Sequence, residues 1–80
     1  MTFHLKPVRV KTGSHDTEGQ LVFAAGFLVA VLVRLSDDHE EDAGKWFLEA
    51  GFDGADDPVK PKFADLREAQ DWIRHRLDRH

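Results

Sequence analysis

The hydrophobic residues of this chain are concentrated in one stretch, residues 20–35, in which Arg34 is the only charged side chain. The stretch is rich in valine, and β-branched residues fit a pleated strand better than a helix. It is also shorter than the roughly 20 apolar residues that a membrane-spanning helix requires. Gly26 suits the positive φ of a tight turn. We therefore predict a β-hairpin with strands near 20–25 and 27–36 and Ala25-Gly26 as its loop; a buried helix is the alternative.

The alternation of side chains within this hairpin predicts two faces, because successive residues of a strand point to opposite sides of a sheet. One predicted face carries Gln20, Val22, Ala24, Phe27, Val29, Val31, Val33 and Leu35. The other carries Leu21, Phe23, Leu28, Ala30, Leu32 and Arg34. Both sets are mainly apolar, so each face needs either a covering element or a partner.

Two further strands are predicted on either side of the hairpin. Residues 3–11 alternate apolar and polar side chains with a change of phase at Pro7, which is typical of an edge strand or a bulge. Residues 45–52 place Trp46, Leu48, Ala50 and Phe52 on one face. The connections are short and rich in polar residues, glycine and proline, which favours pairing between consecutive strands.

A helix is predicted over residues 65–78, where an apolar stripe recurs at helical spacing. The stripe consists of Leu66, Ala69, Trp72, Ile73 and Leu77. Asp65 and Glu68 have the spacing of a capping box at its start. Residues 1–80 are thus expected to form a single α+β domain: a four-stranded antiparallel meander with one C-terminal helix packed on one face.

The helix is expected to cover the face that carries Trp46 and Leu48 together with Phe23, Leu28, Ala30 and Leu32. The opposite face includes Lys45 and Glu49, and burying unpaired charges is costly. That second face is expected to remain open, with an apolar centre made of Val22, Val29, Val31, Val33 and Phe47.

The charge of the chain is −4, and its acidic residues gather in the middle. Residues 36–57 carry nine acidic side chains and one lysine, which is a poor composition for tracking a phosphate backbone. The chain has no cysteine, so disulfides, thiol catalysis and cysteine zinc sites are excluded. The first residues lack the layout of a signal peptide, and we expect a cytoplasmic protein without a membrane span.

No motif predicts catalysis, a cofactor or a metal site. The acidic run 37–42 matches neither the spacing of a calcium loop nor that of a helical zinc motif, and Asp53, Asp56 and Asp57 are expected at the other end of the fourth strand. Ser14, His15 and Asp16 are adjacent in sequence, whereas a catalytic triad converges from separate elements. We interpret the segment 12–19 and the acidic run 37–42 as solvated loops. The five histidines are dispersed along the sequence and are expected on the surface: His4, His15, His39, His75 and His80.

The uncovered apolar face is the feature that predicts a function. We expect a protein-interaction module or a homodimer that uses Val22, Val29, Val31, Val33 and Phe47, with a second copy or another protein as the partner. Two alternatives remain at this stage. One is a nucleic-acid-binding sheet domain, which would be favoured if Lys6, Arg9 and Lys11 clustered with Arg34. The other is a small-ligand binder that uses a groove between helix and sheet.

Overall fold

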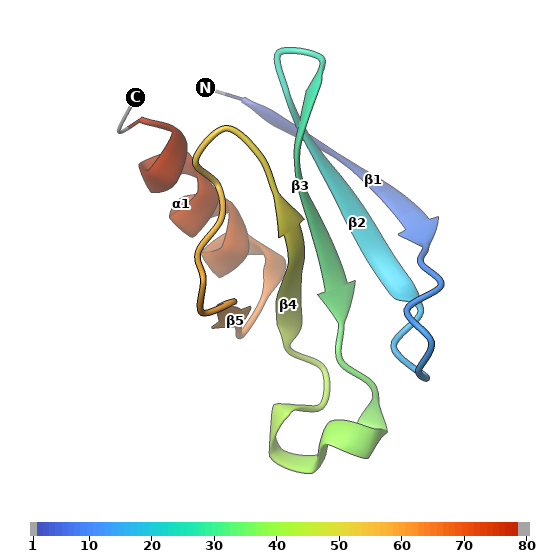
Figure 1. Cartoon of the computed structure of the whole chain (residues 1–80). Helices are drawn as coiled ribbons and strands as arrows, with labels where there is room; N and C mark the ends of the chain where they lie inside the picture. Colours follow the sequence, from blue (N-terminus) through green and yellow to red (C-terminus); the bar gives the residue numbers. More distant parts are fainter. Residues whose placement is uncertain (1, 79–80) are drawn as a thin grey trace.

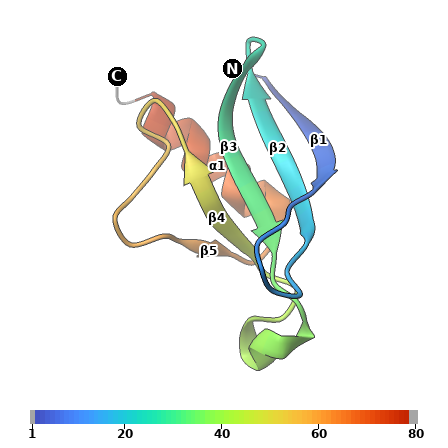
Figure 2. The same ribbon diagram turned by 45° about the vertical axis from the view of Figure 1, so that its right-hand side comes forward.

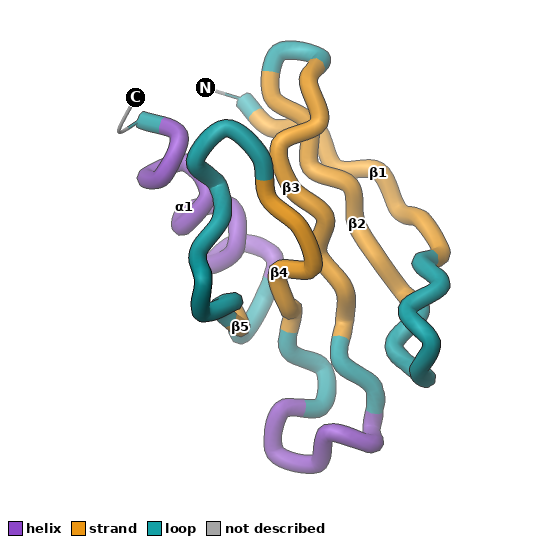
Figure 3. The backbone as a smooth tube through the Cα atoms, in the orientation of Figure 1, coloured by secondary structure: helices purple, strands orange, loops and turns teal. Residues whose placement is uncertain are grey.

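The computed structural model describes residues 2–78 and confirms an α+β fold built on an antiparallel meander (Figures 1 and 3). The sheet has the strand order β1-β2-β3-β4-β5, and a 3₁₀ helix, η1, joins β3 to β4. The elements are β1 (Phe3–Arg9), β2 (Glu18–Ala24), β3 (Phe27–Arg34), η1 (Asp37–Asp42), β4 (Trp46–Gly51), β5 (Lys62–Phe63) and α1 (Leu66–Leu77). The two-residue strand β5 was not predicted. It pairs with β4 and lies in the connection between the predicted strand 45–52 and the predicted helix 65–78.

The central hairpin turns through Ala25 and Gly26, as predicted. Their φ values are 51° and 84°, the left-handed conformation at both positions that matches a tight two-residue turn to the twist of the strands. The alternative of a buried helix over this stretch is therefore wrong. We call the end of the sheet that carries this turn the upper end, and the end near η1 the lower end (Figure 1).

An extra residue in β3 changes the predicted assignment of the two faces. Val22 pairs with Ala30 while Phe23 pairs with Leu28, which leaves Val29 as a β-bulge. A bulge inserts one residue into a strand. Beyond it, the side chains that pair across the two strands differ by one position from those that regular alternation predicts, so the partner strand presents its opposite set of side chains to a given face. As a result, all of β2 is reversed from the prediction. Val22 and Val29 lie on the helix side, and Phe23 and Leu28 lie on the opposite side.

A second bulge, in β4, acts in the same way. Val31 pairs with Ala50 and Leu32 pairs with Leu48, so Glu49 is the extra residue. Ala50 therefore shares the side of Val31, away from the helix. Phe52 follows the strand and is 49% exposed. The prediction that Ala50 and Phe52 belong to the helix-covered face is wrong.

Strand β1 lies at one edge of the sheet, as predicted, but its phase does not change at Pro7. The pairing runs without interruption from Phe3 opposite Ala24 to Arg9 opposite Glu18. An edge strand tolerates proline because there the backbone N–H that proline lacks can point to solvent, where no neighbouring strand requires it. Phe3 and Leu5 pack against the core, so Lys6 and Val8 face away from the helix.

Helix α1 covers one face of the sheet, and the apolar core lies between them (Figures 1 and 2). Ala69, Ile73 and Leu77 are buried, and Leu66 and Trp72 are partly buried against the same cluster, so the predicted stripe is confirmed. From the sheet, the core receives Val22, Ala24, Val29, Ala30, Leu32, Trp46 and Leu48. Burying this apolar area is the main favourable contribution to folding.

The predicted N-terminal cap of the helix is also confirmed. The Asp65 carboxylate accepts a hydrogen bond from the Glu68 backbone N–H at 2.8 Å, and the Glu68 carboxylate accepts one from the Ala64 N–H at 2.6 Å. These bonds satisfy two backbone donors at the helix start. Within residues 2–78, no helix has the length and apolar character needed to cross a membrane.

Candidate interaction surface

The side of the sheet turned away from α1 is covered by no helix, and Figure 2 shows it in front of the helix. We call this surface the open face. Its partly exposed apolar residues do not belong to the cluster beneath the helix. The open face carries Leu21, Phe23, Leu28, Val31, Ala50 and Phe47, flanked by Lys6 on β1 and Glu49 on β4.

The structure places the five predicted contact residues in three different environments. Val31 and Phe47 lie on the open face and are partly exposed. Val33 lies on the same side but is only 2% exposed. Val22 and Val29, at 0% and 6%, belong to the core under the helix, so their assignment to the open face is wrong.

The loop between β1 and β2 explains why Val33 is buried. Figure 2 shows this loop crossing in front of the lower ends of β2 and β3. A Cβ atom on Gly19 would lie 2.6 Å from a methyl carbon of Val10, so the start of the loop rests directly on β2. Thr12, Ser14 and Asp16 line a hollow of about 270 Å³ together with Val33. The lower end of the open face is therefore already covered by the chain itself.

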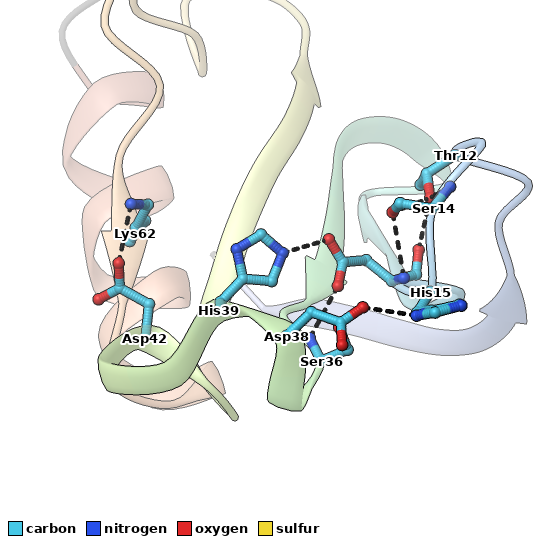
Figure 4. Close-up of polar contacts among 9 residues, drawn as sticks. Thr12, Ser14, His15, Ser36, Asp38, His39, Asp42 and Lys62 are labelled. Carbon is cyan, nitrogen blue, oxygen red and sulfur yellow. Dashed lines mark hydrogen bonds and ion pairs between the residues drawn. The ribbon is translucent and has the colours of Figure 1, made fainter.

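Two histidine–aspartate pairs connect this loop to η1 (Figure 4). His15 Nδ1 lies 2.5 Å from Asp38 Oδ2, and His39 Nε2 lies 2.6 Å from Asp16 Oδ2. Each segment thus contributes one histidine and one aspartate to the other. Both segments are mainly exposed, as predicted, and the structure adds that positions 23 residues apart in sequence meet here. Of the other histidines, His4 and His75 are exposed, as predicted, and His80 lies outside the described residues.

Asp16 is the least exposed member of this cluster and holds two segments together. Its Oδ1 accepts a hydrogen bond from the Ser36 backbone N–H at 2.8 Å. That bond, followed by the contact with His39, lowers the pKa of Asp16 from 3.8 to about 2, because both favour the carboxylate form. Asp16 therefore remains an anion at all but strongly acidic pH.

A second carboxylate, Asp42, joins η1 to the last strands. The Lys45 ammonium donates to Asp42 Oδ1 at 2.9 Å, and the Lys62 ammonium donates to Oδ2 at 3.0 Å. These two lysines, Lys45 foremost, lower the pKa of Asp42 to about 2. The acidic run is thus fixed at the lower end of the sheet by partners on both sides.

Most polar groups around the lower hollow are already satisfied by one another, and Glu49 is the exception among its lining residues. Asp16 bonds to His39 and Ser36, Lys62 pairs with Asp42, and the Thr12 hydroxyl donates to the Asp16 carbonyl oxygen at 2.8 Å. A small-ligand site instead directs unpaired polar groups toward its ligand. Among residues 2–78, no group of three or more histidine, aspartate and glutamate side chains is placed to hold a metal ion.

A second hollow, of about 430 Å³, lies at the upper end between the hairpin turn and Leu77 of α1. Its lining is apolar apart from Asp53, with Phe27, Leu28 and Val29 on the sheet side. This position corresponds to the helix–sheet groove of the small-ligand alternative. A ligand is oriented by several polar groups that converge on it, and the single carboxylate of Asp53 does not provide such a set.

The basic residues that would favour nucleic acid do not all share one face of the sheet. Lys6 faces the open side, whereas Arg34 pairs with Trp46 on the helix side of β3. The open face does present two aromatic side chains, Phe23 and Phe47, but the nearby Lys62 is paired with Asp42. Stacking surfaces for single-stranded nucleic acid combine aromatics with a positively charged groove, and that second part is missing from the described surface.

Four residues of the open face were not predicted from the sequence as contact residues. They are Leu21, Phe23 and Leu28, which occupy the face, and Lys6 at its margin. Regular alternation assigned the first three to the helix side, and nothing in a run of small and branched apolar residues marks where a bulge will form. The one accessible signal was the phase of 3–11: alternation without a slip at Pro7 places Lys6 and Val8 on the same side.

Comparisons with known protein families, with curated proteins and with solved structures found no match to this chain.

Proposed function

We propose that this protein is a small cytoplasmic protein-interaction domain that forms a homodimer through the open face. One observation carries the proposal: five apolar side chains remain partly exposed on the open face. They are Leu21, Phe23, Leu28, Val31 and Phe47. Contiguous apolar patches of this kind mark interaction sites, whereas single exposed apolar residues are ordinary.

The use of the remaining elements supports this proposal. Helix α1 covers the other face, and the loop between β1 and β2 covers only the lower end of the open face. Burial stabilises by about 25 cal/mol per Å² of apolar surface, so pairing two such patches offsets part of the entropy lost on association. The margins carry one charge of each sign, Lys6 and Glu49, which suits contact with an identical surface.

The test is the solution mass of the protein as a function of concentration, by sedimentation equilibrium from micromolar to millimolar. The wild type is expected to approach twice its 9.1 kDa mass. Val31→Asp is expected to remain a folded monomer, because it places a charge at the centre of the patch and leaves the core under the helix intact.

Val59→Asp provides the matched control. Val59 is 81% exposed in the connection between β4 and β5, so the same change there adds the same charge away from the open face. This variant is expected to dimerise like the wild type. A wild-type chain that stays monomeric at millimolar concentration would refute the proposal.

A further inference from the structure

The two charged residues at the margins of the open face lie in the same row across the sheet. Lys6 of β1 pairs with Leu21, Leu21 pairs with Val31, and Val31 pairs with Ala50. Glu49 is the bulged residue next to Ala50. The row therefore has a cation at one margin, an anion at the other, and apolar side chains between them.

Neither charge is paired within the part of the chain that the structure describes. Lys6 and Glu49 are both exposed, and neither takes part in an ion pair among residues 2–78. Two other lysines, Lys45 and Lys62, are in contrast already paired, because both contact Asp42. The margins of the open face thus keep their charge for an external partner.

We propose that Lys6 and Glu49 set the arrangement of the dimer: each Lys6 pairs with the partner's Glu49 about a two-fold axis that runs parallel to the strands between β2 and β3. This inference rests on the proposed function. Rotation about such an axis places β1 of one copy over β4 of the other, at the same height. Aligned sheets pack about 10 Å apart, a distance that the two long side chains span from both sides. The loop between β1 and β2 would meet the partner's loop at the lower end, so the two sheets must diverge toward that end.

The same axis matches the apolar centre of the face to itself. It places β2 over the partner's β3, so Leu21 lies against the partner's Val31, and Phe23 lies against the partner's Leu28. These are the residues that already share rows within one sheet. The apolar part of each row therefore meets apolar side chains, and each charged margin meets the opposite charge.

The other face-to-face arrangement is electrostatically unfavourable. A two-fold axis perpendicular to the strands places β1 over β1, so Lys6 would meet the partner's Lys6 and Glu49 the partner's Glu49. Like charges in such contacts are repulsive, and interfaces use this repulsion to exclude wrong arrangements. Specificity for one axis then follows from two residues per chain.

The experiment reverses each charge separately and then mixes the variants. Lys6→Glu and Glu49→Lys should each weaken self-association by about tenfold, because each homodimer would contain two like-charge contacts. An equimolar mixture should form heterodimers with an affinity near that of the wild type, because both contacts regain opposite charges. Native mass spectrometry with one variant isotope-labelled measures the heterodimer fraction directly.

Arg67→Glu is the control for net charge, because Arg67 is an exposed residue of α1 on the other side of the molecule. It changes the charge as Lys6→Glu does and should leave the dimer unaffected. The outcomes separate this inference from the proposed function. If Val31→Asp abolishes the dimer but the charge variants and their mixture behave like the wild type, the arrangement is refuted and the open-face dimer stands. If Lys6→Glu binds the wild type more tightly than either binds itself, the perpendicular axis is correct instead.

Discussion

Val31 and Leu32 are neighbours in β3, yet they belong to surfaces with different roles. Leu32 is fully buried under α1, whereas Val31 is partly exposed at the centre of the open face. The two residues have similar hydrophobicity, so the difference comes from the single covering element. Burial under the helix therefore lets Leu32 stabilise the domain, whereas Val31 on the open face stays partly in contact with solvent.

The open face is itself divided. At its lower end, Val33 is covered by the loop that the histidine–aspartate pairs fasten to η1. At its upper end, Phe23 and Leu28 have no such cover. The chain thus protects one part of an apolar sheet with its own loops and leaves the other part uncovered.

The largest expected difference between the two faces comes from the same substitution made on each. Val22→Asp places an unpaired charge in the core and should cost more than about 4 kcal/mol, enough to unfold most of a domain of this size. Val31→Asp should keep its secondary structure, because its side chain faces solvent in the monomer. Circular dichroism at 25 °C compares them; equal loss in both variants would mean that the faces do not differ as described.

Removing apolar side chains without adding charge should sharpen the comparison. Ile73→Ala empties part of the core beneath the sheet, and such deletions typically cost about 2–5 kcal/mol in the free energy of unfolding. Phe23→Ala on the open face should cost less than about 1 kcal/mol, provided that both are measured in the monomeric Val31→Asp background. Urea denaturation gives both values, and a larger cost for Phe23→Ala would contradict the assignment of faces.

A smaller effect is expected where the helix begins. Asp65→Ala removes the acceptor for the Glu68 N–H and should lower the free energy of unfolding by about 1 kcal/mol. Arg67→Ala, an exposed change two residues further along the chain, should stay within about 0.5 kcal/mol of the wild type. Both are measured by thermal or urea denaturation. Similar values for the two variants would show that the cap contributes nothing.

The last effect is confined to acidic pH and tests the covered end of the open face. The pKa of Asp16 is about 2 in the folded chain and 3.8 as its ordinary value, so the stability that it contributes is complete above pH 4. That stability is lost as pH falls toward 2, because the proton then binds more tightly to the unfolded chain. Asp16→Asn should make the melting temperature less dependent on pH across this range. Parallel curves for the two proteins would contradict this role for Asp16.

Local structure could be predicted from the sequence, because turns, helix caps and helical stripes depend on residues within a few positions of one another. The period of Leu66, Ala69, Ile73 and Leu77 fixed the helix and its buried side, Asp65 fixed its start, and Gly26 fixed the turn of the hairpin. The valine-rich run, the alternating segments 3–11 and 45–52 and the helical stripe together predicted a meander with one helix on one face.

The identity of the residues on the open face depends on the tertiary structure. A bulge adds one residue to one strand, and because side chains alternate with a period of two, the bulge at Val29 transferred the whole of β2 to the opposite side. Regular alternation carries no record of such an insertion, since it depends on how the strands fit against each other and against α1. The same holds for the pairs of His15 with Asp38 and His39 with Asp16, which exist because the meander brings two turns to one end of the sheet. Sequence spacing places these residues far apart, and folding places them within hydrogen-bond distance.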